Sequence, residues 1–100
     1  MTEGKIVGAL GLCRRAGKVT VGAYLVKEEI RSGRAALVLI ALDTGEDTKE
    51  KLLRLAEHRG VRTERIALNK AALAAAVGKE GEAVCVSVPK EFVNLVLASL

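Results

Sequence analysis

The side chains best suited to covalent chemistry in this chain are two cysteines, Cys13 and Cys85, and a single histidine, His58. A catalytic cysteine needs a base beside it, and a zinc site needs ligands at recognisable spacings. The cysteines lie far apart without a CxxC spacing, and most acidic residues stand near Lys or Arg, as on ordinary helix surfaces. We therefore expect no enzyme, no metal site and no cofactor. We interpret the cysteines as small buried thiols of a reducing cytoplasm.

The segment from Gly11 to Lys18 is superficially similar to the P-loop of nucleotide-binding proteins. However, five residues rather than four separate Gly11 from Gly17, and Val19 stands where a Ser or Thr would hold magnesium. A helical pattern rather than a strand also precedes the segment. Nucleotide binding at this loop is therefore not expected.

Positive charge is concentrated in the N-terminal part of the chain. Residues 1–40 contain seven Lys or Arg against three Asp or Glu, and residues 41–100 contain nine of each, so the first forty residues carry the whole net charge of +4. Most of it comes from Arg14, Arg15, Lys18, Lys27, Arg31 and Arg34. Such clustering is typical of a surface that binds a polyanion, and equally of a solvated face that keeps a protein soluble.

A helix start at Gly22 is the segment best suited to bind such a polyanion. Gly22 lets a partner approach the backbone closely, and the unpaired N–H groups of a helix N-terminus favour an anion such as phosphate. Tyr24 stands at the same helix start, where it either packs against the core or the cap, or stacks on a base. Tyr24 and Phe92 are the only aromatic residues, which excludes the stacking platform of an RRM or an OB-fold protein.

Hydrophobic periodicity and turn residues predict that helices and strands alternate along the whole chain. Helices are expected over 3–16, 22–32, 46–59, 70–77 and from Pro89 onward. Strands are expected over 18–21, 37–42 and 83–88, and a short one within 61–68. This order implies one α/β domain over residues 1–100, built as a three-layer α/β/α sandwich. No apolar stretch reaches the roughly 18 residues of a membrane helix, and the first residues lack the pattern of a signal peptide.

The ends and the buried sides of the helices can also be predicted. Gly17 and Gly33 end the first two helices, Asp43 or Thr44 caps the third, and Asn69 caps the fourth. The residues expected to face inward are Ile6, Ala9, Leu10 and Cys13 in the first helix and Leu52, Leu53 and Ala56 in the third.

The unbroken apolar run from Leu37 to Leu42 predicts a central strand with helices on both of its faces. Val38 and Ile40 are therefore expected to be buried.

Several short motifs span nearly the whole chain. They are Arg-Ala-Gly-Lys-Val at 15–19, Gly22 before the second helix, Ile-Arg-Ser-Gly-Arg-Ala-Ala-Leu-Val-Leu at 30–39, Ala-Leu-Asp-Thr at 41–44, Asn69-Lys70-x-x-Leu73, and Gly78 before the last strand. As a set they resemble the ribosomal protein L-seven-Ae / L-thirty-e superfamily and, within it, the small bacterial YlxQ-type proteins. The resemblance implies a sandwich with a four-stranded mixed sheet, and binding to kink-turn RNA, a bent duplex with tandem sheared G·A pairs.

The resemblance also implies where RNA binds. In the superfamily the N-terminus of the second helix enters the RNA major groove, and the loop before the last strand covers a flipped-out nucleotide. Together with nearby basic residues, this implies an RNA-binding surface made of Lys18, Gly22, Ala23, Tyr24, Lys27, Lys70, Gly78, Lys79, Ala83 and Val84.

The chain departs from the kink-turn binders at the start of the second helix. Those proteins place an Asn-Glu pair two and three residues after the glycine and a Lys six residues after it, where this chain has Tyr24, Leu25 and Glu28. Leu25 has no polar atom to pair with a guanine, and Glu28 repels phosphate. We therefore expect the native chain to prefer a kink-turn only weakly over a plain duplex.

We interpret the chain as a cytoplasmic, non-catalytic, monomeric RNA-binding protein associated with the ribosome. Its expected partner is ribosomal or kink-turn RNA, with no membrane partner. The alternative is a protein-interaction subunit that keeps the fold but has lost specific RNA recognition. Salt-dependent RNA affinity would separate the two.

Overall fold

The computed structural model describes residues 2–100, and side chains from residue 4 onward, so Met1 of the expected domain lies outside the described residues. Helices and strands alternate along this part of the chain, as predicted. The elements are α1 (Thr2–Arg15), β1 (Thr20–Val21), α2 (Ala23–Ser32), β2 (Leu37–Ile40), α3 (Glu46–His58), β3 (Arg62–Arg65), α4 (Lys70–Ala76), β4 (Cys85–Val88), the 3-10 helix η1 (Lys90–Phe92) and α5 (Val93–Ala98).

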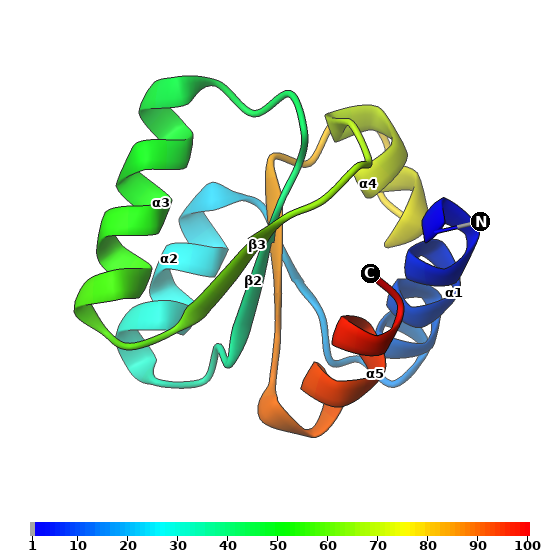
Figure 1. Cartoon of the computed structure of the whole chain (residues 1–100), viewed down its shortest axis with the longest axis horizontal. Coiled ribbons are helices and arrows are strands. Elements are labelled where there is room, and N and C mark those ends of the chain that lie inside the picture. Colours follow the sequence, from blue (N-terminus) through cyan, green and yellow to red (C-terminus); the bar gives the residue numbers. More distant parts are fainter. Residues whose placement is uncertain (1) are drawn as a thin grey trace.

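The strands form one mixed sheet of four strands in the order β1-β4-β2-β3. β4 is antiparallel to both of its neighbours, whereas β3 is parallel to β2. Consequently β1, β2 and β3 end on the side of the sheet where β4 begins. We call this side the upper end of the sheet, since it lies at the top of Figure 1, and the opposite side the lower end.

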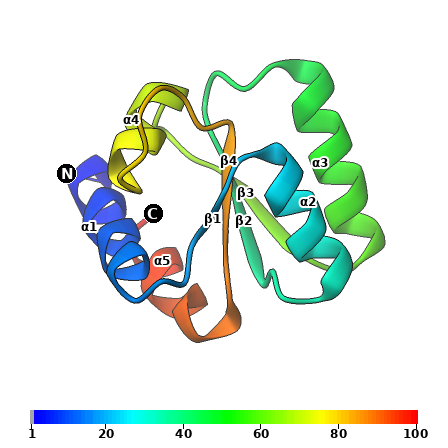
Figure 2. The same ribbon diagram turned by 180° about the vertical axis from the view of Figure 1, so that it is seen from behind.

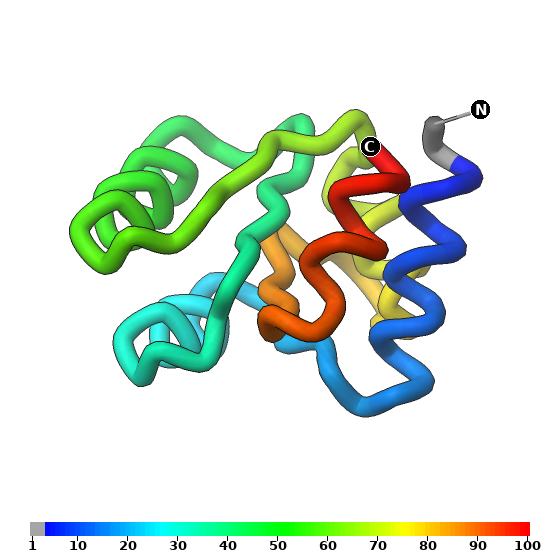
Figure 3. Tube along the Cα trace, turned by 60° about the horizontal axis from the view of Figure 1, so that its bottom comes forward, coloured from blue at the N-terminus to red at the C-terminus, as the bar shows by residue number. Residues whose placement is uncertain are grey.

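Helices cover both faces of this sheet. Figures 1 and 2 show α2 and α3 on one face and α1, α4 and α5 on the other, and Figure 3 shows α1 and α5 side by side. Leu37 and Leu39 of β2 belong to the core beneath α1, α4 and α5, whereas Val38 and Ile40 belong to the core beneath α2 and α3. The expected α/β/α sandwich with a central, doubly covered strand is therefore confirmed.

The predicted helix boundaries at Gly17, Gly33 and Asn69 are confirmed. Gly17 has φ 70° and Gly33 has φ 81°, the left-handed conformation that ends α1 and α2. The Asn69 side chain caps α4 by accepting a hydrogen bond of 2.8 Å from the backbone N–H of Ala72. The expected inward-facing residues of α1 are all buried: Ile6, Ala9, Leu10 and Cys13.

Three of the predicted strands were too long. The apolar run reaches Leu42, but β2 ends at Ile40, and the Leu42 side chain is exposed. The chain turns there toward α3, although Ala41 still donates a hydrogen bond to the carbonyl of Val84. β4 and β1 are likewise shorter than the predicted 83–88 and 18–21, whereas β3 lies within 61–68, where a short strand was predicted.

The predicted cap of α3 is wrong. Gly45 is the N-cap, and no side chain caps the helix. Thr44 instead donates its hydroxyl to the Val84 carbonyl at 2.8 Å, and Asp43 Oδ1 accepts the backbone N–H of Lys70 at 2.8 Å. Both side chains thus fasten the loop after β2 to β4 and α4, contacts that a local capping pattern does not reveal.

Two further details differ from the prediction. Leu53 is exposed rather than inward-facing, because it lies about 100° round the helix from the buried Leu52. Pro89 precedes η1, so the C-terminal helical segment begins with a 3-10 turn rather than directly with α5.

The two outer strands of the sheet are unlike its centre. β1 has only two residues. β3 reads Arg-Thr-Glu-Arg, and each of its residues is at least partly exposed. Within the described chain, no helix combines the length and the apolar character needed to cross a membrane.

Candidate functional site

The start of α2 presents unusual backbone geometry at the upper end of the sheet. Gly22 has φ 96° and ψ 152°, and its N–H donates to the carbonyl of Cys85 at 3.0 Å, which fixes the helix start against β4. No side chain caps the helix, and its first turn contains no acidic residue. The free N–H groups and the positive end of the helix dipole therefore face outward, an arrangement that attracts an anion.

Two large side chains project from this helix start. Tyr24 is 75% exposed and Leu25 is 54% exposed. The interpretation of Tyr24 as a core or cap residue is therefore wrong, because Val26 and Ile30 form the buried side of α2. Tyr24 is free to stack on a partner. Glu28, on the same helix, is paired with Arg31 at 2.9 Å.

Lys27 lies on the side of α2 that faces the start of β4. Lys27 is partly buried. Burial of the Cys85 thiol raises its pKa to about 12, and the positive charge of Lys27 partly offsets this rise. The ammonium group of Lys27 is therefore close enough to the Cys85 thiol, at the upper end of the sheet, for its charge to act on it.

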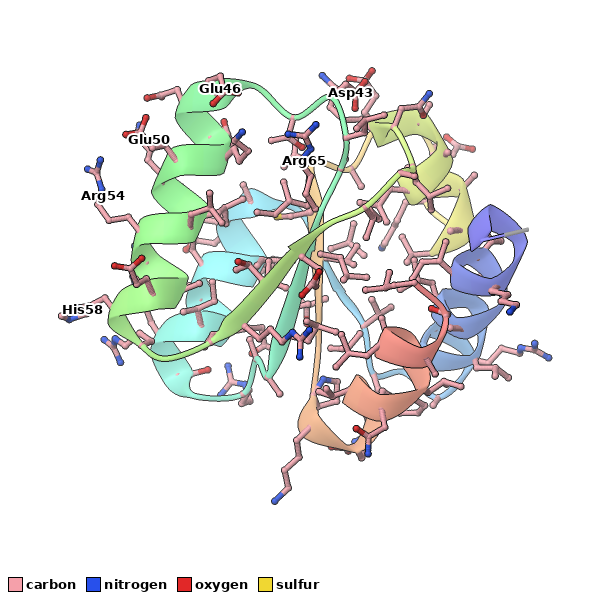
Figure 4. The ribbon with its side chains drawn as sticks, in the orientation of Figure 1. Asp43, Glu46, Glu50, Arg54, His58 and Arg65 are labelled. Atoms are coloured by element: carbon pink, nitrogen blue, oxygen red, sulfur yellow. The ribbon has the colours of Figure 1, made fainter. Side chains whose placement is uncertain are left out.

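The start of α4 lies at the same end. Lys70 donates its backbone N–H to Asp43, accepts the N–H of Ala83 at 3.0 Å, and places its ammonium 3.8 Å from Glu82. Figure 4 shows Asp43 next to the start of α4. Lys70 is thus held between the loop after β2 and the loop before β4.

The loop from Gly78 to Val84 runs back along α4. The backbone N–H of Lys79 donates to Ala74 at 2.8 Å, and the Lys79 side chain is exposed. Ala83 is buried, so only its backbone could face a partner. The carbonyl of Val84 is occupied, because it accepts from both Ala41 and Thr44. Ala83 and Val84 therefore shape the loop.

Arg14 crosses from the end of α1 to this loop. Its guanidinium occupies the space that a Cβ at Gly78 would fill, and Gly78 has φ 71°. Glycine at this position therefore serves two purposes, the left-handed turn after α4 and the close approach of Arg14.

The structure separates Lys18 from the other expected site residues. Thr20 pairs with Ser87 and Val21 with Val86, so β1 runs upward from Lys18 to Gly22. Lys18 lies at the lower end, 3.9 Å from Glu91. The upper end therefore gathers Gly22, Ala23, Tyr24, Lys27, Lys70 and the end of the loop at Ala83 and Val84. Gly78 and Lys79 follow the opposite end of α4 from Lys70, beside Arg14, and Lys18 lies at the lower end.

One basic residue at the upper end was missed by the sequence analysis. Arg65 is the last residue of β3 and pairs in register with Ile40 at the end of β2. Figure 4 shows it between the start of α3 and Asp43. The strand that carries it has no apolar pattern, but the rule that parallel strands end together would have indicated its position.

The candidate catalytic groups are not arranged for catalysis. Burial raises the pKa of both the Cys13 and Cys85 thiols, which keeps them protonated, and both cysteines are free. His58 is exposed at the end of α3, and Figure 4 shows it pointing outward along with Arg54. Among the described residues, no group of three His, Cys, Asp or Glu side chains could hold a metal ion.

Comparison with known sequences identifies related proteins. The profile of the Ribosomal protein L7Ae/L30e/S12e/Gadd45 family matches residues 4–96. The RNA-binding protein YlxQ of Bacillus subtilis (strain 168) is 34% identical over 91 residues, which are 91% of this chain and 90% of that protein. The RNA-binding protein YlxQ of Enterococcus faecium is 40% identical over 55 residues, 52% of this chain and 53% of that protein.

Solved structures share the whole fold. A protein of unknown function from Bacillus halodurans superposes with a TM-score of 0.87 at 29% identity, covering 95% of both chains. The Giardia lamblia 15.5kD RNA binding protein superposes with a TM-score of 0.77 at 22% identity, covering 98% of this chain and 83% of the other. The second similarity concerns the fold alone.

Proposed function

The chain belongs to the Ribosomal protein L7Ae/L30e/S12e/Gadd45 family, and we propose that it is a non-catalytic protein that binds structured RNA through the upper end of its sheet. The RNA is of the kink-turn type or a segment of ribosomal RNA, and the protein acts in the cytoplasm in association with the ribosome. The two related YlxQ proteins are named as RNA-binding, which agrees with this proposal.

The observation that carries the proposal is the exposed, uncapped start of α2, which lies at the same end of the sheet as two lysines. The helix start has free N–H groups and no acidic residue in its first turn, Lys27 belongs to the same helix, and Lys70 begins α4 at the same end of the sheet. Helix N-termini and lysines are common phosphate contacts in nucleic-acid complexes. Tyr24, exposed at the same place, is suited to stack on an unpaired base.

The experiment is a series of RNA titrations at several salt concentrations, with a kink-turn, a plain duplex and a ribosomal RNA fragment. Lys27→Gln and Lys70→Gln should each lower the affinity and flatten the log–log salt slope by about 0.9, the value of one lost phosphate contact. Arg54→Gln is the matched control, because Arg54 is exposed on the outer side of α3 and, among the described side chains, pairs only with Glu50. Unchanged binding by both lysine variants would contradict the proposal.

One observation favours the second candidate, a protein-interaction subunit. Tyr24 and Leu25 are both exposed at the upper end, and Leu42 is exposed nearby at the end of β2. Exposed apolar side chains are common in protein interfaces. If no RNA binds and Tyr24→Ala abolishes capture of a specific protein, this second function applies.

A further inference from the structure

The lower end of the sheet carries basic residues that the upper surface does not use. Lys18 and Arg34 belong to the basic N-terminal part of the chain, and both lie there, next to Lys90 of η1. These three side chains line a hollow of about 490 Å³ between the end of α2, β1 and the turn after β4. Arg14 and Arg15, at the end of α1, directly precede the turn that leads to Lys18.

Arg34 is held in a fixed orientation beside this hollow. Its Nε donates to Glu29 Oε2 at 2.6 Å, and the other carboxylate oxygen of Glu29 accepts the hydroxyl of Thr20 at 3.0 Å. Glu29 is only 23% exposed, whereas the Arg34 side chain is 68% exposed. The carboxylate thus anchors one side of the guanidinium, and the two Nη groups remain available for a ligand.

The two lysines are less constrained. Lys18 is 52% exposed, and its 3.9 Å contact with Glu91 is the longest ion pair found between described side chains. Such an exposed pair contributes little and exchanges easily for a phosphate partner. Lys90 has no ion pair within the described part of the chain. Three cations against Glu29 and Glu91 leave the hollow with net positive charge.

The lining also indicates what kind of ligand fits. Arginine and lysine together match phosphate oxygens, and Ser87 adds a hydroxyl. No aromatic side chain lines the hollow, so it offers no surface on which a base could stack. A free nucleotide would therefore gain only its phosphate contacts, whereas a polymer could contact Lys18, Arg34 and Lys90 with successive phosphates.

We propose that this hollow is a second RNA-binding surface, which contacts the phosphate backbone of an RNA segment other than the one bound at the upper end. This proposal takes its class of ligand, RNA, from the proposed function, but the residues of the hollow are independent of that function. Because the two surfaces lie at opposite ends of the strands, a short RNA on one leaves the other free. The protein would then hold two RNA segments together, reading structure at the upper end and only charge at the lower end.

The test is a bridging assay with the full chain. A short kink-turn is immobilised, protein is added, and capture of a labelled plain RNA duplex is measured. The lower-end variant Lys18→Gln/Lys90→Gln keeps the Glu29–Arg34 pair and should therefore keep the fold. This variant should still bind the kink-turn but capture at least tenfold less duplex. The log–log slope of its duplex affinity against salt should fall by about 1.8, or about 0.9 for each lysine. Arg54→Gln should capture as much duplex as the native chain.

Further arms separate the proposal from its alternatives. Undiminished capture by the lower-end variant overturns it. Displacement of the duplex by inorganic phosphate or a nucleoside monophosphate at equal phosphate concentration also overturns the proposal, because the hollow is then a small-anion site. Competition by polyglutamate that is as strong as competition by RNA overturns it too, because an acidic protein is then the partner. If the kink-turn does not bind but direct titration with the duplex depends on Lys18 and Lys90, the proposed function fails and the lower-end surface remains.

Discussion

Gly22 and Gly33 flank the same helix, and replacing each with alanine separates two kinds of backbone strain. Gly33 has φ 81° and ψ 8°, in the left-handed helical region, whereas Gly22 has φ 96° and ψ 152°. A Cβ built at either position would meet no other atom within 4 Å. The cost of each alanine therefore comes from the backbone alone.

The magnitudes follow from the two regions. A non-glycine residue in the left-handed helical region is uncommon but tolerated, so Gly33→Ala should cost about 1 kcal/mol. The region of Gly22 is essentially restricted to glycine, so Gly22→Ala should cost about 2–3 kcal/mol. Asparagine visits the left-handed helical region more readily than alanine, so Gly33→Asn should cost less than Gly33→Ala. Gly22→Asn should bring no such relief.

Urea denaturation measures these differences. With a typical m-value of about 1.5 kcal/mol per M, the unfolding midpoint should fall by about 1.3–2 M for Gly22→Ala and by about 0.7 M for Gly33→Ala. Equal midpoints for the two alanine variants would refute the reasoning, as would a Gly22→Asn variant that is more stable than Gly22→Ala. Affinity for the RNA bound at the upper end should fall only for the Gly22 variants, because Gly33 lies at the other end of α2.

Three other changes test the core, the loop and the RNA preference. Ile40→Ala should cost roughly 2–5 kcal/mol in chemical denaturation, because Ile40 is buried beneath α2 and α3; a loss below 1 kcal/mol would contradict this. Asp43→Ala should cost about 1 kcal/mol through loss of its hydrogen bond to α4, and Asp43→Asn, which keeps an acceptor, should cost clearly less; equal losses would exclude that role. The triple change Tyr24→Asn, Leu25→Glu, Glu28→Lys should raise the preference for a kink-turn over a plain duplex at least about tenfold, measured by competitive titration with circular dichroism as the check of folding. An unchanged preference, or a native chain that already selects the kink-turn strongly, would show that these positions do not control it.

The elements could be predicted from the sequence because each carries its own signal. The helix stripe of α1, the glycines after α1 and α2, and the Asn69 cap are local patterns, and each agrees with the structure. The cap of α3 could not be predicted in the same way. Asp43 and Thr44 fit a capping pattern, but their partners, Lys70 and Val84, are distant in sequence and come close only in the fold.

The candidate site was predictable only in part for the same reason. Gly22 and Lys70 follow from the family motifs, and the structure brings their segments together at the upper end. Lys18 is near Gly22 in sequence, but four residues of extended chain span about 13 Å and carry it toward the lower end. Arg65 stands in a strand without apolar alternation, so no pattern in the sequence draws attention to it.

The composition of the outer strands has a consequence for how the protein behaves at high concentration. An unpaired strand at the side of a sheet can recruit the same strand of another molecule and begin aggregation. β1 offers only two residues for such pairing, and β3 offers a strand of two arginines, a threonine and a glutamate. Bringing two copies of β3 together would desolvate like charges without burying apolar surface. The apolar β2, which would aggregate most readily, is enclosed between β3 and β4. The hydrophilic β3 therefore shields the most aggregation-prone strand of the sheet.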